Sequence, residues 1–105
     1  MTGSHVPWSV EVQTVEGATR LRLRGELDAA TAAELRERVA ASTTPEVHLD
    51  LTEVTFMDSS GLAALLEGHR LLAESQRRLV LLERSEVVQR VMDLAGVTAH
   101  LTDRD

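Results

Sequence analysis

The sequence changes abruptly from a strand-like to a helix-like pattern between residues 47 and 73. Before the change, Val47, Leu49 and Leu51 alternate with polar residues, and this period of two is typical of a strand with two unlike faces. After it, side chains at helical spacing form one stripe of an amphipathic helix, namely Leu62, Leu65, Leu66, His69, Leu72 and Ala73. The chain must therefore pass from a strand into a helix within a few residues.

Small polar residues occupy this junction. Asp58, Ser59 and Ser60 are all favourable N-cap types, because their side-chain oxygens can accept from the first free N–H groups of a helix. A helix N-terminus also suits an added phosphate, because it combines unpaired donors with partial positive charge. The residues alone leave a cap and a phosphorylation switch open as interpretations, and capping is the commoner role.

The remaining segments predict one α/β domain of order β-β-α-β-α-β-α-β. A hairpin followed by right-handed crossovers gives a mixed, mostly parallel sheet with helices mainly on one face. Strands are expected at 8–13, 19–24, 47–51, 79–82 and 97–102, and helices at 30–41, 60–76 and, after a cap at Ser85, through 94 or 95. Residues 1–7 are expected to form a flexible lead-in, and residues 8–105 the domain.

Several local features set the expected boundaries. Gly25 is expected to end the second strand, and residues 31–34 to form a capping box for the first helix. Ser85 is the expected cap of the third helix, and Gly96 its C′ residue. Residues 79–82 are apolar without alternation, which is the pattern of a central strand.

Composition excludes several classes of function. The 105 residues contain no cysteine, which rules out disulfides and thiolate chemistry, and no apolar run approaches the ~20 residues needed to span a bilayer. A net charge of −6 argues against a general nucleic-acid binder, and the arginines at 20, 22 and 24 are interpreted as a solvated sheet face. We expect a cytoplasmic protein that binds neither nucleic acid nor membrane directly.

The sequence gives little support to an enzyme or a metal site. A nucleophile elbow needs glycine two residues before and after its serine; Gly61 satisfies this for Ser59, but Met57 does not. His69 lies on an apolar stripe, as a packed residue would, and the other available histidines are His48 and His100. Three aspartates are more typical of caps than of metal ligands, namely Asp28, Asp50 and Asp58. We expect no catalysis, metal or cofactor.

Three ordered segments resemble the STAS domain family, which is shared by anti-sigma factor antagonists and the tails of sulphate transporters. Val54-x-Phe56-Met57-Asp58-Ser59-Ser60-Gly61-Leu62 resembles its phosphorylation motif. Gly25-Glu26-Leu27-Asp28, followed by Thr31, Leu35 and Val39, resembles its G-x-L-D entry to the first helix. Residues 79–82 with 88–97 resemble its last strand, helix and glycine, so the match spans residues 8 to 102.

The resemblance implies a phosphorylation cycle. Ser59, with Ser60 as second choice, would be phosphorylated by an anti-sigma factor with serine kinase activity, and a PP2C-type phosphatase would reset it. The unmodified chain would hold the anti-sigma factor and release sigma. Asp28 and Asp58 would orient the hydroxyl or the kinase's metal. The implied partner-binding residues are Asp28, Asp58, Ser59, Ser60, Gly61 and Leu62, on a monomer or weak dimer.

Two other functions fit the same resemblance. One is a STAS subunit without a phosphorylation cycle, such as the partner of a lipid-transport ATPase, and the other is a scaffold subunit of a stress-signalling assembly. The intact Asp58-Ser59-Ser60-Gly61 favours the antagonist. The chain departs from the family by carrying residues 76–78 where a glycine is common, and relative to the longer antagonists it is expected to lack a terminal helix. No residue here independently supports the weak nucleotide binding associated with some STAS domains.

Overall fold

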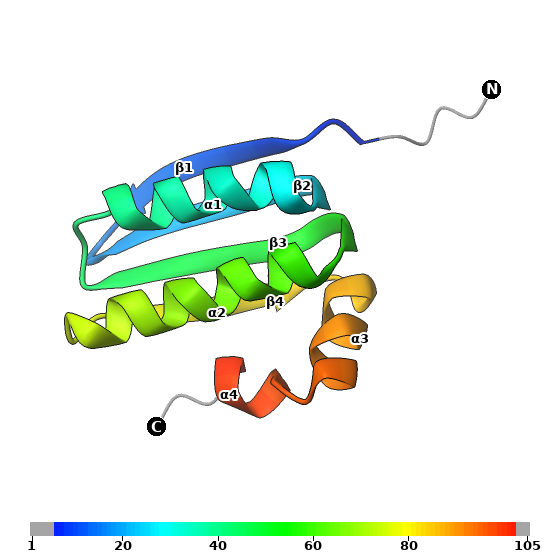
Figure 1. Ribbon diagram of the computed structural model, residues 1–105. Helices are drawn as coiled ribbons and strands as arrows, with labels where there is room; N and C mark the ends of the chain where they lie inside the picture. Colours follow the sequence, from blue (N-terminus) through cyan, green and yellow to red (C-terminus); the bar gives the residue numbers. More distant parts are fainter. Residues whose placement is uncertain (1–5, 103–105) are drawn as a thin grey trace.

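The computed structural model describes residues 6–102, which form a sheet with helices packed on it (Figure 1). Most of the predicted lead-in, residues 1–5, lies outside the described residues, as do residues 103–105. The strands are β1 (Ser9–Val15), β2 (Ala18–Leu27), β3 (Glu46–Met57) and β4 (Arg78–Arg84). The helices are α1 (Ala29–Ala41), α2 (Ser59–Glu74), α3 (Glu86–Ala95) and α4 (Thr98–Thr102).

The sheet has the strand order β1-β2-β3-β4. β1 is antiparallel to β2, whereas β2, β3 and β4 are mutually parallel, as a hairpin followed by βα units requires. α1 and α2 lie side by side over one face of the sheet, α3 contacts β3, and α4 contacts α2 and β4 (Figure 1). The predicted fold class, a single α/β domain with a mixed sheet and helices mainly on one face, is confirmed.

A single apolar cluster between the sheet and the helices forms the core. The alternating positions of β2 and β3 supply its sheet side, and the helices supply their buried stripes. Its fully buried side chains include Leu21, Leu23, Leu27, Leu35, Val47, Leu49, Leu51, Val54, Leu65, Leu72, Val88 and Met92. Each Å² of apolar surface that is buried contributes about 25 cal/mol to the free energy of unfolding, so this cluster is the main stabilising term of the fold.

The predicted final strand at 97–102 is wrong, because these residues form the short helix α4. Gly96 ends α3 in the left-handed conformation, with φ of 75°, as predicted for its C′ glycine. The chain then turns so that Leu101, four residues after Val97, enters the core. The prediction that 79–82 form a central strand is wrong for the same reason: with no later strand beside it, β4 is an edge strand.

The expected boundaries of α1 and β2 also need correction. The capping box of α1 is formed by Asp28 and Thr31 rather than by residues 31–34, because Asp28 is the residue with extended backbone before the helix. β2 does not end at Gly25 but runs to Leu27. Gly25 has φ of 97° at a register irregularity with β3, and a Cβ there would lie 3.0 Å from the Trp8 Cα.

The turn after α2 uses a residue that is unusual for its backbone conformation. α2 ends at Glu74 rather than at Gln76, and Ser75 is its C-cap. Gln76 has φ of 62°, in the left-handed region where glycine is preferred. Arg77 then holds the turn, because its guanidinium donates to the Ser42 and Thr44 carbonyl oxygens at 3.0 and 2.8 Å. This turn therefore adopts a left-handed conformation without a glycine.

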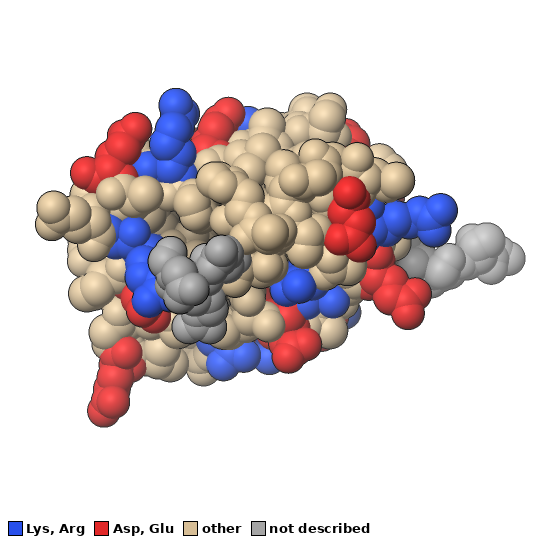
Figure 2. All heavy atoms as spheres, turned by 90° about the horizontal axis from the view of Figure 1, so that it is seen from below, with Lys and Arg blue, Asp and Glu red and all other residues tan. Residues whose placement is uncertain are grey.

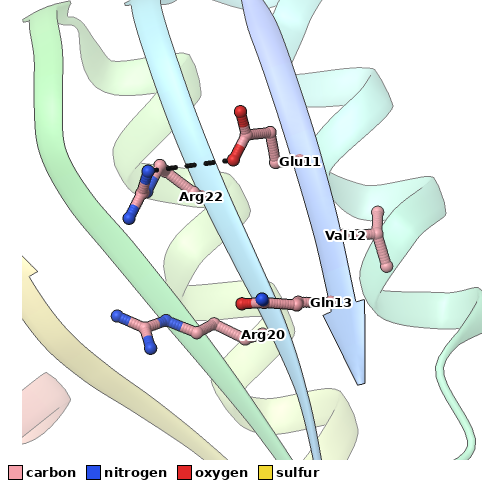
Figure 3. Close-up of a pocket in the computed structure, with 5 residues that line it drawn as sticks. All are labelled: Glu11, Val12, Gln13, Arg20 and Arg22. Carbon is pink, nitrogen blue, oxygen red and sulfur yellow. Dashed lines mark ion pairs between the residues drawn. The ribbon is translucent and has the colours of Figure 1, made fainter. Parts of the chain in front are cut away.

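The face of the sheet opposite the helices carries paired charges. Asp50 lies 3.8 Å from the Arg20 guanidinium and 3.6 Å from that of Arg22. Arg22 also faces Glu11, at 3.8 Å (Figure 3). Arg24 pairs with Glu53. The arginine stripe is thus balanced by carboxylates within the sheet.

Figure 2 views the molecule from the side of α4 and shows uncharged surface in the centre with acidic and basic groups interspersed around it. None of the helices within residues 6–102 is long and apolar enough to cross a bilayer. The same residues contain no group of three or more His, Asp or Glu side chains arranged to hold a metal ion.

His69 of α2 and His100 of α4 meet with ring centroids 4.7 Å apart. Burial, together with the charge of His100, lowers the pKa of His69 below its ordinary value of 6.5. The folded state therefore binds protons at His69 less readily than the unfolded state. His69 lies at the edge of the core, where the sequence pattern placed it.

We expect the free energy of unfolding to fall as the pH drops below about 6.5, because the unfolded chain then binds the extra proton. Chemical denaturation between pH 7.5 and 5.5 measures this slope. His69→Gln, which cannot titrate, should reduce the slope, whereas the same slope in the variant and the parent would contradict the assignment to His69.

Candidate functional site

The candidate site lies at the carboxyl ends of β2 and β3. Leu27 and Met57, the last residues of these parallel strands, are register partners, so the chain leaves both strands at the same sheet edge. The Asp58 N–H donates to the Leu27 carbonyl oxygen at 3.4 Å, which ties the second exit to the first. The two predicted aspartates, Asp28 and Asp58, therefore follow neighbouring strand ends.

Both aspartates are helix N-caps. Asp28 Oδ1 accepts from the N–H groups of Ala30 and Thr31 at 3.1 and 3.2 Å, while the Asp28 N–H donates to Thr31 Oγ1 at 2.8 Å. Asp58 Oδ1 accepts from the N–H groups of Ser60 and Gly61 at 2.9 and 3.3 Å. Each carboxylate thus satisfies donors that the first helical turn leaves unpaired.

Ser59 is the first residue of α2, and its side chain is exposed. Within residues 6–102, no hydrogen bond engages its hydroxyl, which is therefore available to a reagent or a partner. Ser60, the second-choice residue, is half-buried and therefore less exposed than Ser59, and its backbone N–H donates to Asp58. The geometry makes Ser59 the more accessible hydroxyl of the pair.

Gly61 and Leu62 face inward. Gly61 is buried, and a Cβ built there would lie 2.7 Å from the Leu27 carbonyl oxygen and 2.8 Å from the Met57 Cγ. Leu62 is half-buried and packs against the core. These two residues thus bring the start of α2 against the end of β2, which fixes the position of Ser59.

The site is acidic. The pKa of Asp28 is lowered, chiefly by the hydrogen bond from the Thr31 N–H. Burial acts in the opposite direction, and the Thr31 hydroxyl and the Ala30 N–H lower the pKa further, so this carboxylate is ionised at neutral pH. The Asp58 carboxylate already occupies the N–H groups of Ser60 and Gly61. A phosphate on Ser59 would therefore add negative charge where the nearest helical donors are already used.

Sequence reasoning overlooked one surface residue beside the motif. Phe56, two residues before Asp58, is 44% exposed. The alternation of β3 breaks here, because Val54 and Met57 are buried while Thr55 and Phe56 are exposed, next to a register irregularity with β2. The signal was an aromatic side chain, one of only two in the chain, within an otherwise aliphatic strand.

Other candidate residues lie elsewhere. Asp50 faces Arg20 and Arg22 on the open sheet face and does not join Asp28 and Asp58. The His48 ring bonds Glu46 at 2.7 Å, and His69 contacts His100. Asp50, His48 and His69 thus each interact with a residue other than Ser59. The arrangement at this sheet edge is that of an exposed serine and two carboxylates that cap neighbouring helices.

Comparison with known proteins shows the family of this chain. The model of the STAS domain matches residues 9–103. An anti-sigma-B factor antagonist of Staphylococcus epidermidis is 30% identical over 92 residues, which cover 85% of each chain. An anti-sigma-B factor antagonist of Listeria monocytogenes is 34% identical over 77 residues, covering 70% of this chain and 68% of that protein.

Solved structures agree with the family match. The unphosphorylated form of SpoIIAA, an anti-sigma factor antagonist, superposes with a TM-score of 0.71 at 25% identity, covering 87% of this chain and 82% of its own. Its phosphorylated form superposes with a TM-score of 0.69 at 24% identity, covering 87% of this chain and 85% of its own. The chain belongs to the STAS domain family.

We expect Gly61→Ala to lower the free energy of unfolding by about 1–3 kcal/mol, because its Cβ would collide with the Leu27 backbone. Gly68→Ala is the matched control in the same helix. Its Cβ would meet only ordinary contacts, the nearest at 3.7 Å from Val39, so a gain of about 0.5–1 kcal/mol is expected. Urea denaturation measures both, and equal effects would refute the close approach at Gly61.

Proposed function

We propose that this chain is an anti-sigma factor antagonist, released from its anti-sigma factor when Ser59 is phosphorylated. The observation that carries the proposal is the exposed Ser59 hydroxyl at the start of α2, beside the capping carboxylates of Asp28 and Asp58. Relatives of this length that bear that name support it, as does SpoIIAA, which has structures in both phosphorylation states.

In the unmodified state, the strand-end surface binds the anti-sigma factor. Ser59 supplies a small neutral contact, and Phe56 supplies exposed apolar area next to it. Aromatic side chains of this kind dominate binding energy when a partner buries them. Occupation of the anti-sigma factor by this chain releases sigma for transcription.

Phosphorylation reverses this binding. The Ser59 Oγ attacks the γ-phosphorus of ATP on a kinase that is itself the anti-sigma factor, ADP leaves, and the hydroxyl proton passes to a base of the kinase. The product carries ≈ −1.5 to −2 charges at neutral pH. Because Asp58 already binds the Ser60 and Gly61 N–H groups, the phosphate faces the partner surface beside two carboxylates. A PP2C-type phosphatase returns the chain to its binding state by hydrolysis.

The serine variants test the switch. Ser59→Ala should bind the anti-sigma factor as the parent does but accept no phosphate, whereas Ser59→Asp should bind about tenfold more weakly or worse, since each ~1.4 kcal/mol is a factor of ten. Ser60→Ala is the control and should still be phosphorylated at Ser59. Calorimetry with a candidate anti-sigma factor from the same genome and phosphopeptide mapping provide the readouts.

Two results would contradict the proposal. Tight binding of the anti-sigma factor by Ser59→Asp would contradict the charge mechanism. Phosphate found on Ser60 would show that Ser60, not Ser59, is the modified residue. A chain that binds transporter subunits but no kinase-like protein would favour the STAS subunit without a phosphorylation cycle.

We expect Phe56→Ala to weaken binding of the anti-sigma factor by about 1–2 kcal/mol, because it removes exposed aromatic area beside Ser59. Leu94→Ala is the matched control: Leu94 is 80% exposed but lies in the last turn of α3. Calorimetry on both variants compares the two positions. A loss of affinity at Leu94 with none at Phe56 would place the interface on α3 instead.

A further inference from the structure

β1 is an edge strand with one side unpaired. Among residues 6–102 it bonds only to β2, and in Figure 1 no other element of these residues runs beside its outer edge. The two-residue turn at 16–17 closes on the pair Val15 and Ala18, so hydrogen-bonded pairs fall at odd residues of β1. The N–H and C=O groups of the intervening residues therefore point outward, at Val10, Val12 and Thr14.

This edge lacks the usual protection against pairing. Natural edge strands are commonly blunted by lysine, proline or a bulge. β1 contains no lysine or proline, its register with β2 is regular over all seven residues, and Glu11 is its single charge. Val12, on the helix side of the strand, is 50% exposed because α1 packs over β2 and leaves β1 partly uncovered, and Val15, on the open face of the sheet, is 40% exposed. A long, regular and half-apolar edge of this kind is a template for another strand.

The side chains select one partner and one register. In an antiparallel pair of two β1 strands centred on Val12, the outward groups of Val10, Val12 and Thr14 all find partners. Glu11 then faces Gln13 of the second copy, which avoids a like-charge contact. Shifting the centre to Glu11 would set two carboxylates opposite each other, which is destabilising.

Both faces of such a pair match. Figure 3 shows Glu11 and Gln13 directed to the same side as Arg20 and Arg22, whereas Val12 points away from them. The polar face of the pair therefore continues the charged open face of the sheet. Val12 pairs with Leu21 in the hairpin, so it lies on the helix side and meets Val12 of the second copy there.

We propose that this chain self-associates through β1, forming a two-fold dimer with one continuous eight-stranded sheet. The contact is about 23 Å long for seven residues, and its area falls below the ~1,200 Å² of a stable interface. The dimer is therefore weak, with a Kd in the micromolar to millimolar range. It leaves the strand-end surface around Ser59 free, so it is independent of the proposed function.

Substitutions at Gln13 test the register. In the Val12-centred pair, Gln13→Lys creates two Glu–Lys contacts and should tighten the dimer about 3- to 30-fold, whereas Gln13→Glu creates two like-charge contacts and should weaken it. A pair centred on residue 13 would be weakened by both changes, and a pair centred on Glu11 by neither. Sedimentation equilibrium up to about 1 mM protein measures the Kd.

A substitution on the two-fold axis tests the contact itself. Val12→Lys sets two ammonium groups opposite each other and should weaken the dimer about tenfold or more. Val15→Lys is the control: it replaces a valine that is 40% exposed and faces Ser9 of the second copy, so it should change the Kd less than threefold. Circular dichroism establishes that each variant folds.

Amide exchange gives a readout at single residues. Protection of the Val10, Val12 and Thr14 amides should rise with protein concentration, while Glu11 and Gln13, already bonded to β2, should not change. A chain that stays monomeric to about 1 mM, or a dimer indifferent to Val12→Lys, overturns the proposal. In the first case, an extended segment of another protein becomes the occupant to seek at this edge.

Discussion

The close approach of α2 to the end of β2 determines the rest of the site. Gly61 lies where a Cβ would meet the Leu27 carbonyl oxygen at 2.7 Å, and the Asp58 N–H bonds the same oxygen. This contact depends on the parallel pairing that aligns Leu27 with Met57. The result is that an exposed serine and two capping carboxylates share one sheet edge. A small residue inside the helix thus positions a polar residue on its surface.

Patterns with a strong period predicted the fold well. The stripe of α2 placed the start of that helix within one residue, and Ser85 and Gly96 were assigned correctly as the ends of α3. The strand before the junction was expected at 47–51, and β3 is longer, running over Glu46–Met57. The exposed state of Ser59 also agrees with the hypothesis built on it. These features depend on local sequence, because periodicity, caps and left-handed glycines act within a few residues.

Features that depend on contacts between distant segments could not be predicted. Val97 to Thr102 has no period that distinguishes a strand from one helical turn, and only the burial of Leu101 decides it. The edge position of β4 follows from that outcome. Likewise, Thr31 fits either of two capping boxes until the backbone of Asp28 is known, and Phe56 is exposed because of a register irregularity with β2. Tertiary packing overrides the local signal in each case.

The central claim is that charge added at residue 59 changes which protein this chain holds. Its most direct measurement is the Kd of the anti-sigma factor for the chain carrying stoichiometric phosphoserine at 59, compared with the unmodified chain in the same buffer. The account predicts at least a ~10-fold loss of affinity that phosphatase treatment restores. Equal affinities before and after phosphorylation would contradict it.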